Sequence, residues 1–251
     1  MRRALLLVLL TACGAPSFVS ARMSAAGPVQ SSVFSRDPGG QLAEEDLQRL
    51  LASPVELDLP ARVGIMPVVT AQDWRGPSPD WRHVPAGVGP FATALRGSEP
   101  FTLVTEMLPI PSGALGMEAL REAAARYALR YVILYREGIR AETRANGVAA
   151  LYVTLLGALF LPGQTLEVDG FLEASLFDVK TGLLLFTVRR SVAARRDSNV
   201  WYPDRKLEAM QTGLARRFAP ELAKDGRTDV ARFADAVKAE QTAEKARVSS
   251  M

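Results

Sequence analysis

The chain is poor in the residues on which most catalytic and metal sites depend. Among its 251 residues there is one cysteine, Cys13, and one histidine, His83. A single cysteine excludes an internal disulfide, and zinc sites of the usual kind need several histidines and cysteines together. A Ser-His-Asp or Cys-His site would have to use His83, which no G-x-S-x-G motif accompanies. We therefore expect no catalytic residue, no bound metal and no cofactor.

Phosphate-binding loops are lacking as well. Gly87-Val88-Gly89 does not have the strand-then-helix spacing that dinucleotide or P-loop sites require. Two acidic groups remain, and they fit the solvated face of a helix and the wet side of a strand: Glu44-Glu45-Asp46, and Glu167, Asp169 and Glu173. A hydrolase that uses such carboxylates is the enzymatic alternative. The pairs Arg189-Arg190 and Arg195-Arg196 could meet anionic headgroups or a partner, but we expect them to be solvated charges on a sheet edge that discourage aggregation.

The sequence has no apolar stretch of the roughly twenty residues that a transmembrane helix needs. In the body of the chain, the fourteen-residue run Val148–Leu161 contains no charge and is too short for an ordinary transmembrane helix. This run could form a pair of core strands, or it could be an amphipathic segment in the membrane interface. We favour burial in the core, because the flanking segments already require a packed sheet.

The N-terminus has the features of a bacterial export sequence. Arg2 and Arg3 are followed by the short apolar run Ala4–Leu10 and then by Leu10-Thr11-Ala12-Cys13. The last four residues resemble the lipobox of bacterial lipoproteins. That resemblance implies removal of residues 1–12 as a signal peptide, a diacylglycerol on the sulfur of Cys13, and acylation such as palmitate on the new amino group. The alternative is a plain signal peptide and an inert cysteine.

A lipid anchor at Cys13 sets expectations for location and charge. Gly14, where Asp favours retention in the inner membrane of enterobacterial lipoproteins, points to the outer membrane, facing the periplasm. Loss of residues 1–12 lowers Lys+Arg from 30 to 28, against 27 Asp+Glu. A nearly neutral mature chain gives no electrostatic reason to expect a nucleic acid partner.

Composition divides the chain into four parts. After the signal peptide, residues 13–55 are predicted to be a lipidated tether with a possible short helix at Gln41–Ala52. Residues 56–238 are predicted to form one globular domain, and 239–251 a disordered polar tail. Within the domain, the Thr70–Pro90 loop carries Trp74, Trp81 and His83. Its tryptophans either fold over the core, which we favour, or form a partner-binding surface.

A β-hairpin over Leu166–Val192 is the clearest local pattern. Apolar and polar residues alternate along its first arm, as in a half-buried strand. The turn Asp178-Val179-Lys180-Thr181-Gly182 allows Asp178 to accept hydrogen bonds from its own turn and Gly182 to adopt a left-handed conformation.

Other segments complete an α/β order. Strands are predicted at Ala61–Val69, Phe101–Glu106 and Tyr131–Tyr135, and helices at Phe91–Arg96, Ser112–Arg130, Leu207–Phe218 and Asp229–Lys238. We expect a single mixed β-sheet whose apolar face is covered by helices.

Three segments carry a resemblance to a known family: Ala61–Val69, Ala123–Tyr135 and Ser175–Phe186. In order and type they resemble envelope lipoproteins with the TolB N-terminal or CsgG-like fold. With the lipobox, this leads us to expect a non-enzymatic, lipid-anchored envelope protein that binds or scaffolds other envelope proteins or forms a homo-oligomer. The alternative is a subunit of an oligomeric export or pore assembly, in which Val148–Leu161 touches the membrane.

Overall fold

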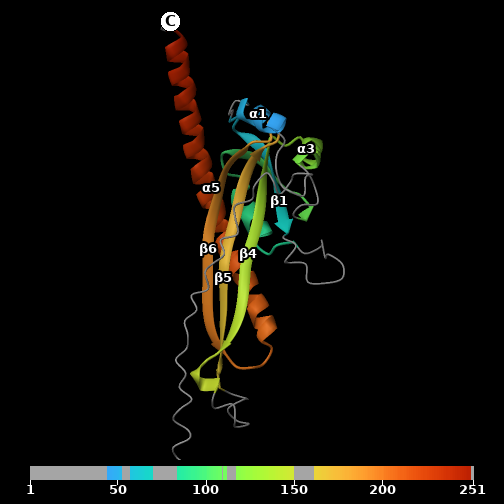
Figure 1. Ribbon diagram of the computed structural model, residues 1–251, viewed down its shortest axis with the longest axis vertical. Coiled ribbons are helices and arrows are strands. Elements are labelled where there is room, and N and C mark those ends of the chain that lie inside the picture. Colours follow the sequence, from blue (N-terminus) through green and yellow to red (C-terminus); the bar gives the residue numbers. More distant parts are fainter. Residues whose placement is uncertain are drawn as a thin grey trace, which may run out of the picture.

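Three long strands, β4 (Tyr131–Ala145), β5 (Gln164–Asp178) and β6 (Leu184–Ser198), form most of the sheet. They pair antiparallel along nearly their whole length. The end of β4 at Ala145, the start of β5 at Gln164 and the end of β6 at Ser198 therefore lie at the same level. The structure is a computed structural model (Figure 1). It describes residues 44–52, 57–69, 84–108, 110–111, 117–149 and 161–249.

Shorter strands extend the sheet beside the first residues of β4. β1 (Ala61–Val69) runs parallel to β4 and to β2 (Phe101–Glu106), and β3 (Ile110–Pro111) pairs with the end of β1. Within the described residues the order is β2-β1-β4-β5-β6, a single mixed sheet. The expected α/β class and mixed sheet are therefore confirmed.

Helices lie on both faces of this sheet, whereas the sequence predicted that they cover one apolar face. α2 (Val88–Leu95) and α5 (Pro203–Ser249) cover one face, where side chains such as Ile65, Ile133 and Leu172 are buried. α3 (Met117–Arg126) lies on the other face, over Val132 and Leu134. The second face is covered because β4 begins with five consecutive apolar or aromatic residues, which bury side chains in both directions.

The hairpin turn is confirmed in detail. The Lys180 amide N–H donates to Asp178 Oδ1 over 2.8 Å, and the Gly182 amide N–H donates to the Asp178 carbonyl over 2.8 Å. Gly182 has φ of 78°, the left-handed conformation that glycine adopts without steric cost. Both arms are longer than predicted.

The strand predicted at Tyr131–Tyr135 continues to Ala145. Beyond Tyr135 the apolar pattern weakens, because even-numbered residues such as Arg140 and Arg144 face outward. Pairing with β5, and the contact of Ile139 with the core, hold this half of β4 in the sheet.

The two helices predicted near the C-terminus are one helix, α5, with Pro220 inside it. Proline ends many helices because it lacks an N–H and crowds the preceding turn. Here Ala219, Leu222 and Ala223 are buried against the sheet, and this packing keeps the helix continuous. α5 also continues to Ser249 through most of the predicted tail 239–251, which is rich in the strong helix formers Ala, Glu and Lys.

The remaining helices are shorter than or shifted from the predictions. α1 (Glu44–Ala52) lies within the possible helix at Gln41–Ala52, and α2 begins three residues before Phe91. α3 ends at Arg126, and Ala128 then has a positive φ of 52°.

Candidate functional site

The residues for which the sequence predicted a special role mostly lie outside the described part. Cys13, Trp74, Trp81 and His83 are among them, as are positions 150–160 of the uncharged run. The prediction that this run is buried in the core is therefore not tested. The polar clusters below come from the described residues alone.

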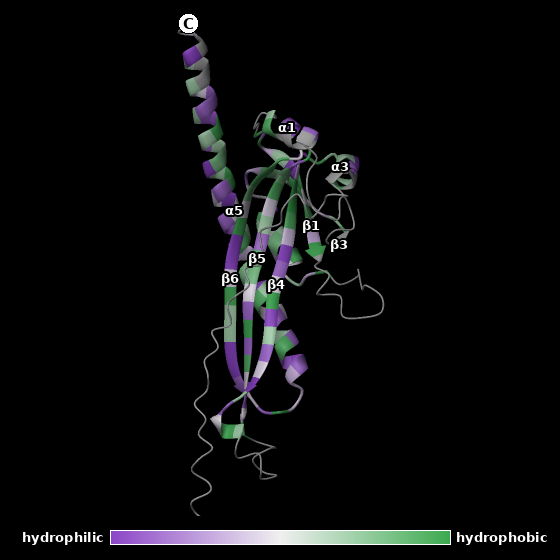
Figure 2. Cartoon of the chain, viewed as in Figure 1, coloured by the Kyte–Doolittle hydropathy of each residue, from purple (hydrophilic) through white to green (hydrophobic). Residues whose placement is uncertain are grey.

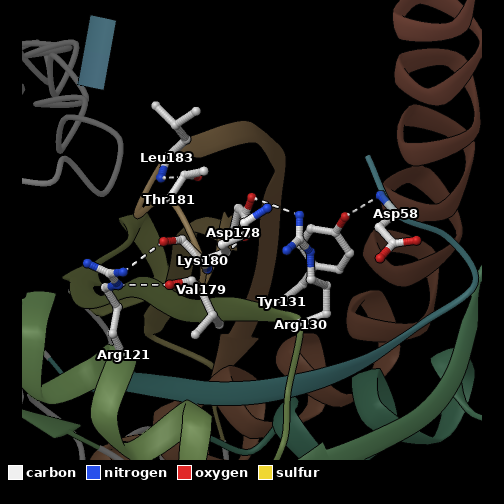
Figure 3. A network of polar contacts seen from close by, with 9 residues as sticks. All are labelled: Asp58, Arg121, Arg130, Tyr131, Asp178, Val179, Lys180, Thr181 and Leu183. Carbon is white, nitrogen blue, oxygen red and sulfur yellow. Dashed lines mark hydrogen bonds and ion pairs between the residues drawn. The ribbon is translucent and has the colours of Figure 1, made fainter. Parts of the chain in front are cut away.

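The first cluster surrounds the turn of the β5–β6 hairpin (Figure 3). Asp178 is 1% exposed. Its Oδ1 accepts from the Lys180 amide, and its Oδ2 accepts from Arg130 Nη2 over 3.3 Å. A backbone donor and a guanidinium thus hold this carboxylate, and its local role is to fix the turn.

Neighbouring elements are joined to the same turn. The Arg121 guanidinium, on α3, donates from Nε to the Val179 carbonyl over 2.8 Å and from Nη2 to the Lys180 carbonyl over 2.7 Å. Nearby, the Tyr131 hydroxyl accepts from the Asp58 amide over 2.7 Å. These bonds connect α3, the segment before β1 and the hairpin, so the network explains the local structure without a ligand (Figure 3).

A second cluster lies where α2 begins. Glu137 Oε1 accepts from the Gly87 amide over 2.7 Å and from the Tyr135 hydroxyl over 3.0 Å. Tyr135 is fully buried, and this burial, together with the nearby Glu137 carboxylate, raises the pKa of its hydroxyl above the ordinary value. The N–H groups at a helix start attract anions. At α2, Glu137 supplies the negative charge from within the chain.

Gly87 is required there for a steric reason. A Cβ at this position would lie 2.2 Å from the Tyr135 hydroxyl and 2.8 Å from Glu137 Oε1. The Gly87-Val88-Gly89 motif, whose spacing did not fit a phosphate loop, thus allows close approach between α2 and β4.

The third cluster corrects the prediction that Glu173 lies on the wet side of a strand. Glu173 is 0% exposed, and its carboxylate faces Arg136 at 3.2 Å and Arg189 at 3.9 Å. The guanidinium of Arg189 also stacks 3.6 Å from the ring centroid of Phe171. Glu167 lies on the same face, and its side chain is 29% exposed, which is nearer to the solvated position predicted for it.

The prediction of solvated arginines on β6 is also wrong in part. Arg190 points toward α5 and donates to Glu221 over 2.8 Å and to Asp225 over 2.6 Å. Arg195, in contrast, is 70% exposed beside Glu167. Arg190 therefore holds α5 against the sheet, whereas Arg195 fits the expected solvated charge.

The face of the sheet under α2 and α5 contains a small apolar cavity. Phe91, Leu176 and Phe186 are among its lining residues, together with Gly226 and Val230 of α5. Its volume of about 20 Å³ is enough for roughly one water-sized molecule. This cavity is too small for an organic substrate.

Sequence reasoning missed two exposed aromatic residues, Trp201 and Tyr202, between β6 and α5. Their exposed fractions are 45% and 65%. They come shortly after Ser198, where β6 ends level with the end of β4 and the start of β5. Figure 1 shows that this end of the long strands is opposite the hairpin turn. No periodic pattern includes the two aromatic residues. Only an aromatic pair immediately before Pro203 could have drawn attention to this loop.

Neither a metal-binding group nor a membrane-spanning helix occurs among the described residues. No group of three or more His, Cys, Asp or Glu side chains is arranged to hold a metal ion in this part of the chain. None of the helices described there is both long and apolar enough to cross a membrane.

Comparison with known proteins gives no family. No family model matches the chain, and no curated protein matches it. Solved structures share part of the fold at low similarity. The PelC dodecamer from Paraburkholderia phytofirmans is 17% identical, with 63% of this chain and 85% of that chain covered and a TM-score of 0.30.

Two lipoproteins are similar to a comparable extent. Rare lipoprotein B from Shewanella oneidensis is 10% identical over 67% of this chain and 97% of its own, with a TM-score of 0.30. Lipoprotein GNA1162 from Neisseria meningitidis is 12% identical over 62% and 98%, with a TM-score of 0.29.

Proposed function

We propose that this chain is a non-enzymatic, lipid-anchored protein of a bacterial envelope that binds or scaffolds other envelope components. The observation that carries the proposal is the sequence Leu10-Thr11-Ala12-Cys13 after a short apolar run. Two or three acyl chains at this position anchor a protein stably, because each buried CH₂ contributes about 0.8 kcal/mol.

The polar clusters of the described residues support a structural and binding role. The carboxylates of Asp178, Glu137 and Glu173 each face an arginine, a tyrosine hydroxyl or backbone N–H groups of the fold. Their geometry is accounted for by joining elements to one another. A screen of hydrolase substrates with the whole purified chain tests the non-enzymatic part, and turnover that a carboxylate substitution abolishes would contradict it.

Location and assembly belong to the same proposal. Gly14 favours the outer membrane, with the body in the periplasm. The TolB N-terminal or CsgG-like likeness of Ala61–Val69, Ala123–Tyr135 and Ser175–Phe186 is the basis for expecting an envelope partner or a homo-oligomer.

Metabolic labelling with a palmitate analogue tests the anchor. The expected result is label on the wild-type chain and none on Cys13→Ala, which removes the sole sulfhydryl. Fractionation should place the labelled chain in the outer membrane. An unlabelled wild-type chain, or label that persists on Cys13→Ala, would refute the anchor.

Partner binding is tested separately by cross-linking in cells, followed by purification of the intact acylated chain. Cys13→Ala is the matched control, because an envelope partner should be captured less when the anchor is removed. Recovery of the acylated chain as an isolated monomer would contradict a scaffolding role.

A second candidate function is a subunit of an oligomeric export or pore assembly. The observation that favours it is that the uncharged run Val148–Leu161 connects β4 to β5 at an end of the sheet. Leu155→Asp separates the candidates. Loss of membrane insertion with a folded domain favours the pore subunit, whereas unfolding means that Leu155 is a core residue.

A further inference from the structure

The end of the molecule opposite the hairpin turn brings together two connections that are distant in sequence. β4 ends at Ala145, β5 begins at Gln164 and β6 ends at Ser198, and these residues pair directly across the sheet. The β4–β5 and β6–α5 connections therefore leave the sheet at the same level. We call this end the distal end, and define it by Val148, Ala149, Leu161, Trp201 and Tyr202.

The aromatic residues of the distal end have the chemistry of a membrane interface. Tryptophan and tyrosine combine an apolar ring with a polar group, and they are enriched at the level of lipid headgroups. Trp201 and Tyr202 are adjacent and are 45% and 65% exposed. The Arg205 guanidinium lies 5.3 Å from the ring centroid of Tyr202, where its positive charge can meet a lipid phosphate.

The base of the neighbouring β4–β5 connection lies at the same end. Hydrogen bonds close its base: the Asn146 amide donates to the Gly163 carbonyl over 3.0 Å, and Asn146 Nδ2 donates to the Pro162 carbonyl over 2.7 Å. Val148, Ala149 and Leu161, the described apolar residues at the two ends of this connection, are each partly exposed.

The exposed face of the sheet differs in polarity from the distal end. Over the halves of β4 and β6 nearest the distal end, Figure 2 shows hydrophilic bands alternating with hydrophobic ones, and Arg140 and Arg195 are among the exposed residues there. A sheet whose uncovered face is polar and whose end carries exposed aromatics has the order of polarity expected for a protein whose end meets a bilayer from water.

We propose that the distal end enters the interfacial layer of a phospholipid bilayer, with Trp201 and Tyr202 at the level of the headgroups. In the function proposed above, acyl chains on Cys13 fix the protein to a membrane. This second contact orients the long axis of the sheet toward the bilayer surface. It requires neither acylation of Cys13 nor assembly into a pore.

The test uses the full chain with Cys13→Ser, so that its outcome does not depend on the lipid anchor. Trp74→Phe and Trp81→Phe leave Trp201 as the only tryptophan. The probe is a vesicle of phosphatidylethanolamine and phosphatidylglycerol that contains phospholipids brominated at known acyl positions. We expect the emission of Trp201 to shift to shorter wavelength and to be quenched most strongly by shallow bromines.

A pair of substitutions then measures the contribution of the aromatics to binding. Trp201→Ser with Tyr202→Asn is expected to weaken partition into vesicles by at least about tenfold, as loss of two interfacial aromatics implies. Asparagine suits position 202 because Tyr202 has a positive φ of 52°. Near-ultraviolet circular dichroism of each variant verifies that it is folded.

Tyr127→Ser is the matched control. Tyr127 is also an exposed tyrosine, at 51%, but it lies between α3 and β4, near the hairpin turn. Its substitution should leave partition unchanged. The apolar run Ala4–Leu10 is present in all variants and contributes to them equally.

Three results would overturn the proposal. The first is vesicle binding in which Trp201 is quenched by aqueous iodide and not by brominated lipid. The second is no binding to vesicles at all. The third is unchanged partition of the Trp201→Ser, Tyr202→Asn chain combined with a smaller mass in light scattering, which would make the distal end a contact between copies of the chain.

Discussion

The two halves of β4 follow the same sheet but have different surroundings. Residues Tyr131–Tyr135 are all buried, between α5 and α2 on one face and α3 on the other. Residues Arg140–Ala145 are exposed, although they pair with β5 just as fully. Strand pairing alone therefore does not make a buried strand. The covering helices decide whether one or both faces of a strand are buried. A run of consecutive apolar residues marks the half of β4 that is buried on both faces.

The largest change in stability that this comparison predicts comes from a substitution on the face of the sheet where α3 lies. Glu173→Ala removes the buried carboxylate that faces Arg136 and Arg189, and should lower the free energy of unfolding by about 3 to 5 kcal/mol. Denaturation in urea measures the loss.

Glu167→Ala is the matched control for Glu173→Ala. Glu167 is on the same strand and face, but its side chain is 29% exposed and its arginine partners lie at 3.6 and 3.7 Å. Its replacement should cost at most about 1 kcal/mol. Equal costs for the two substitutions would mean that burial does not distinguish these carboxylates.

Leu134→Ala probes the apolar part of the same face. Leu134 is 0% exposed in the cluster that contains α3 residues Leu120 and Ala124, and its truncation should cost about 2 to 5 kcal/mol. Arg140→Ala, on the same strand and face, should change stability by no more than about 0.5 kcal/mol. A large cost for Arg140→Ala in urea would show that the outer half of β4 is covered too.

Gly87→Ala tests the close contact between α2 and β4. The new methyl group meets the Tyr135 hydroxyl and Glu137, so we expect a loss of about 1 to 3 kcal/mol. Gly89→Ala is the internal control, because no atom lies within 4 Å of the place that its new methyl group would take, and alanine favours the helix by about 0.5 to 1 kcal/mol. Thermal unfolding compares the two. A stabilised Gly87→Ala would contradict the steric account.

The smallest effect concerns pH. The raised pKa of Tyr135 means that the folded chain retains this proton when the unfolded chain loses it, near pH 10. The contribution of the protonated Tyr135 hydroxyl to the free energy of unfolding is complete below about pH 10. Above that pH it declines by about 1.4 kcal/mol per pH unit.

Tyr135→Phe should be less stable by about 1 to 2 kcal/mol at pH 7, because the bond to Glu137 is lost. The difference from wild type should narrow between pH 10 and 11, since the variant has no hydroxyl to titrate there. Urea denaturation at pH 8 and pH 11 measures it. A constant difference would mean that Tyr135 ionises alike in both states.

Much of the fold could be predicted because its patterns are local. Alternation along Leu166–Val192 gives the hairpin, and Asp178 with Gly182 gives its turn. The join between the two predicted C-terminal helices could not be predicted from local rules. Pro220 argues for a break, and only the burial of its neighbours against the sheet explains the continuous helix.

The polar sites were less accessible to sequence reasoning. Period-two alternation places Glu173 on an outward face, and its burial depends on Phe171, Arg136 and Arg189, which come from three strands. Trp201 and Tyr202 belong to no pattern. They become notable only because three strands end at one level beside them.

The continuity of α5 has a further consequence for the C-terminal turns. From Val230, which packs against the sheet, one helix leads to Ser249, and Figure 1 shows it extending past the hairpin end. In an α-helix each residue advances the axis by about 1.5 Å and rotates the chain by about 100°. The angle at which each side chain beyond the sheet points around the helix axis is therefore fixed by its distance in sequence from Val230. Inserting one residue after Val230 would rotate the whole C-terminal extension about the helix axis by about 100°. Inserting eighteen residues, which make about five full turns, would lengthen the extension without rotating it.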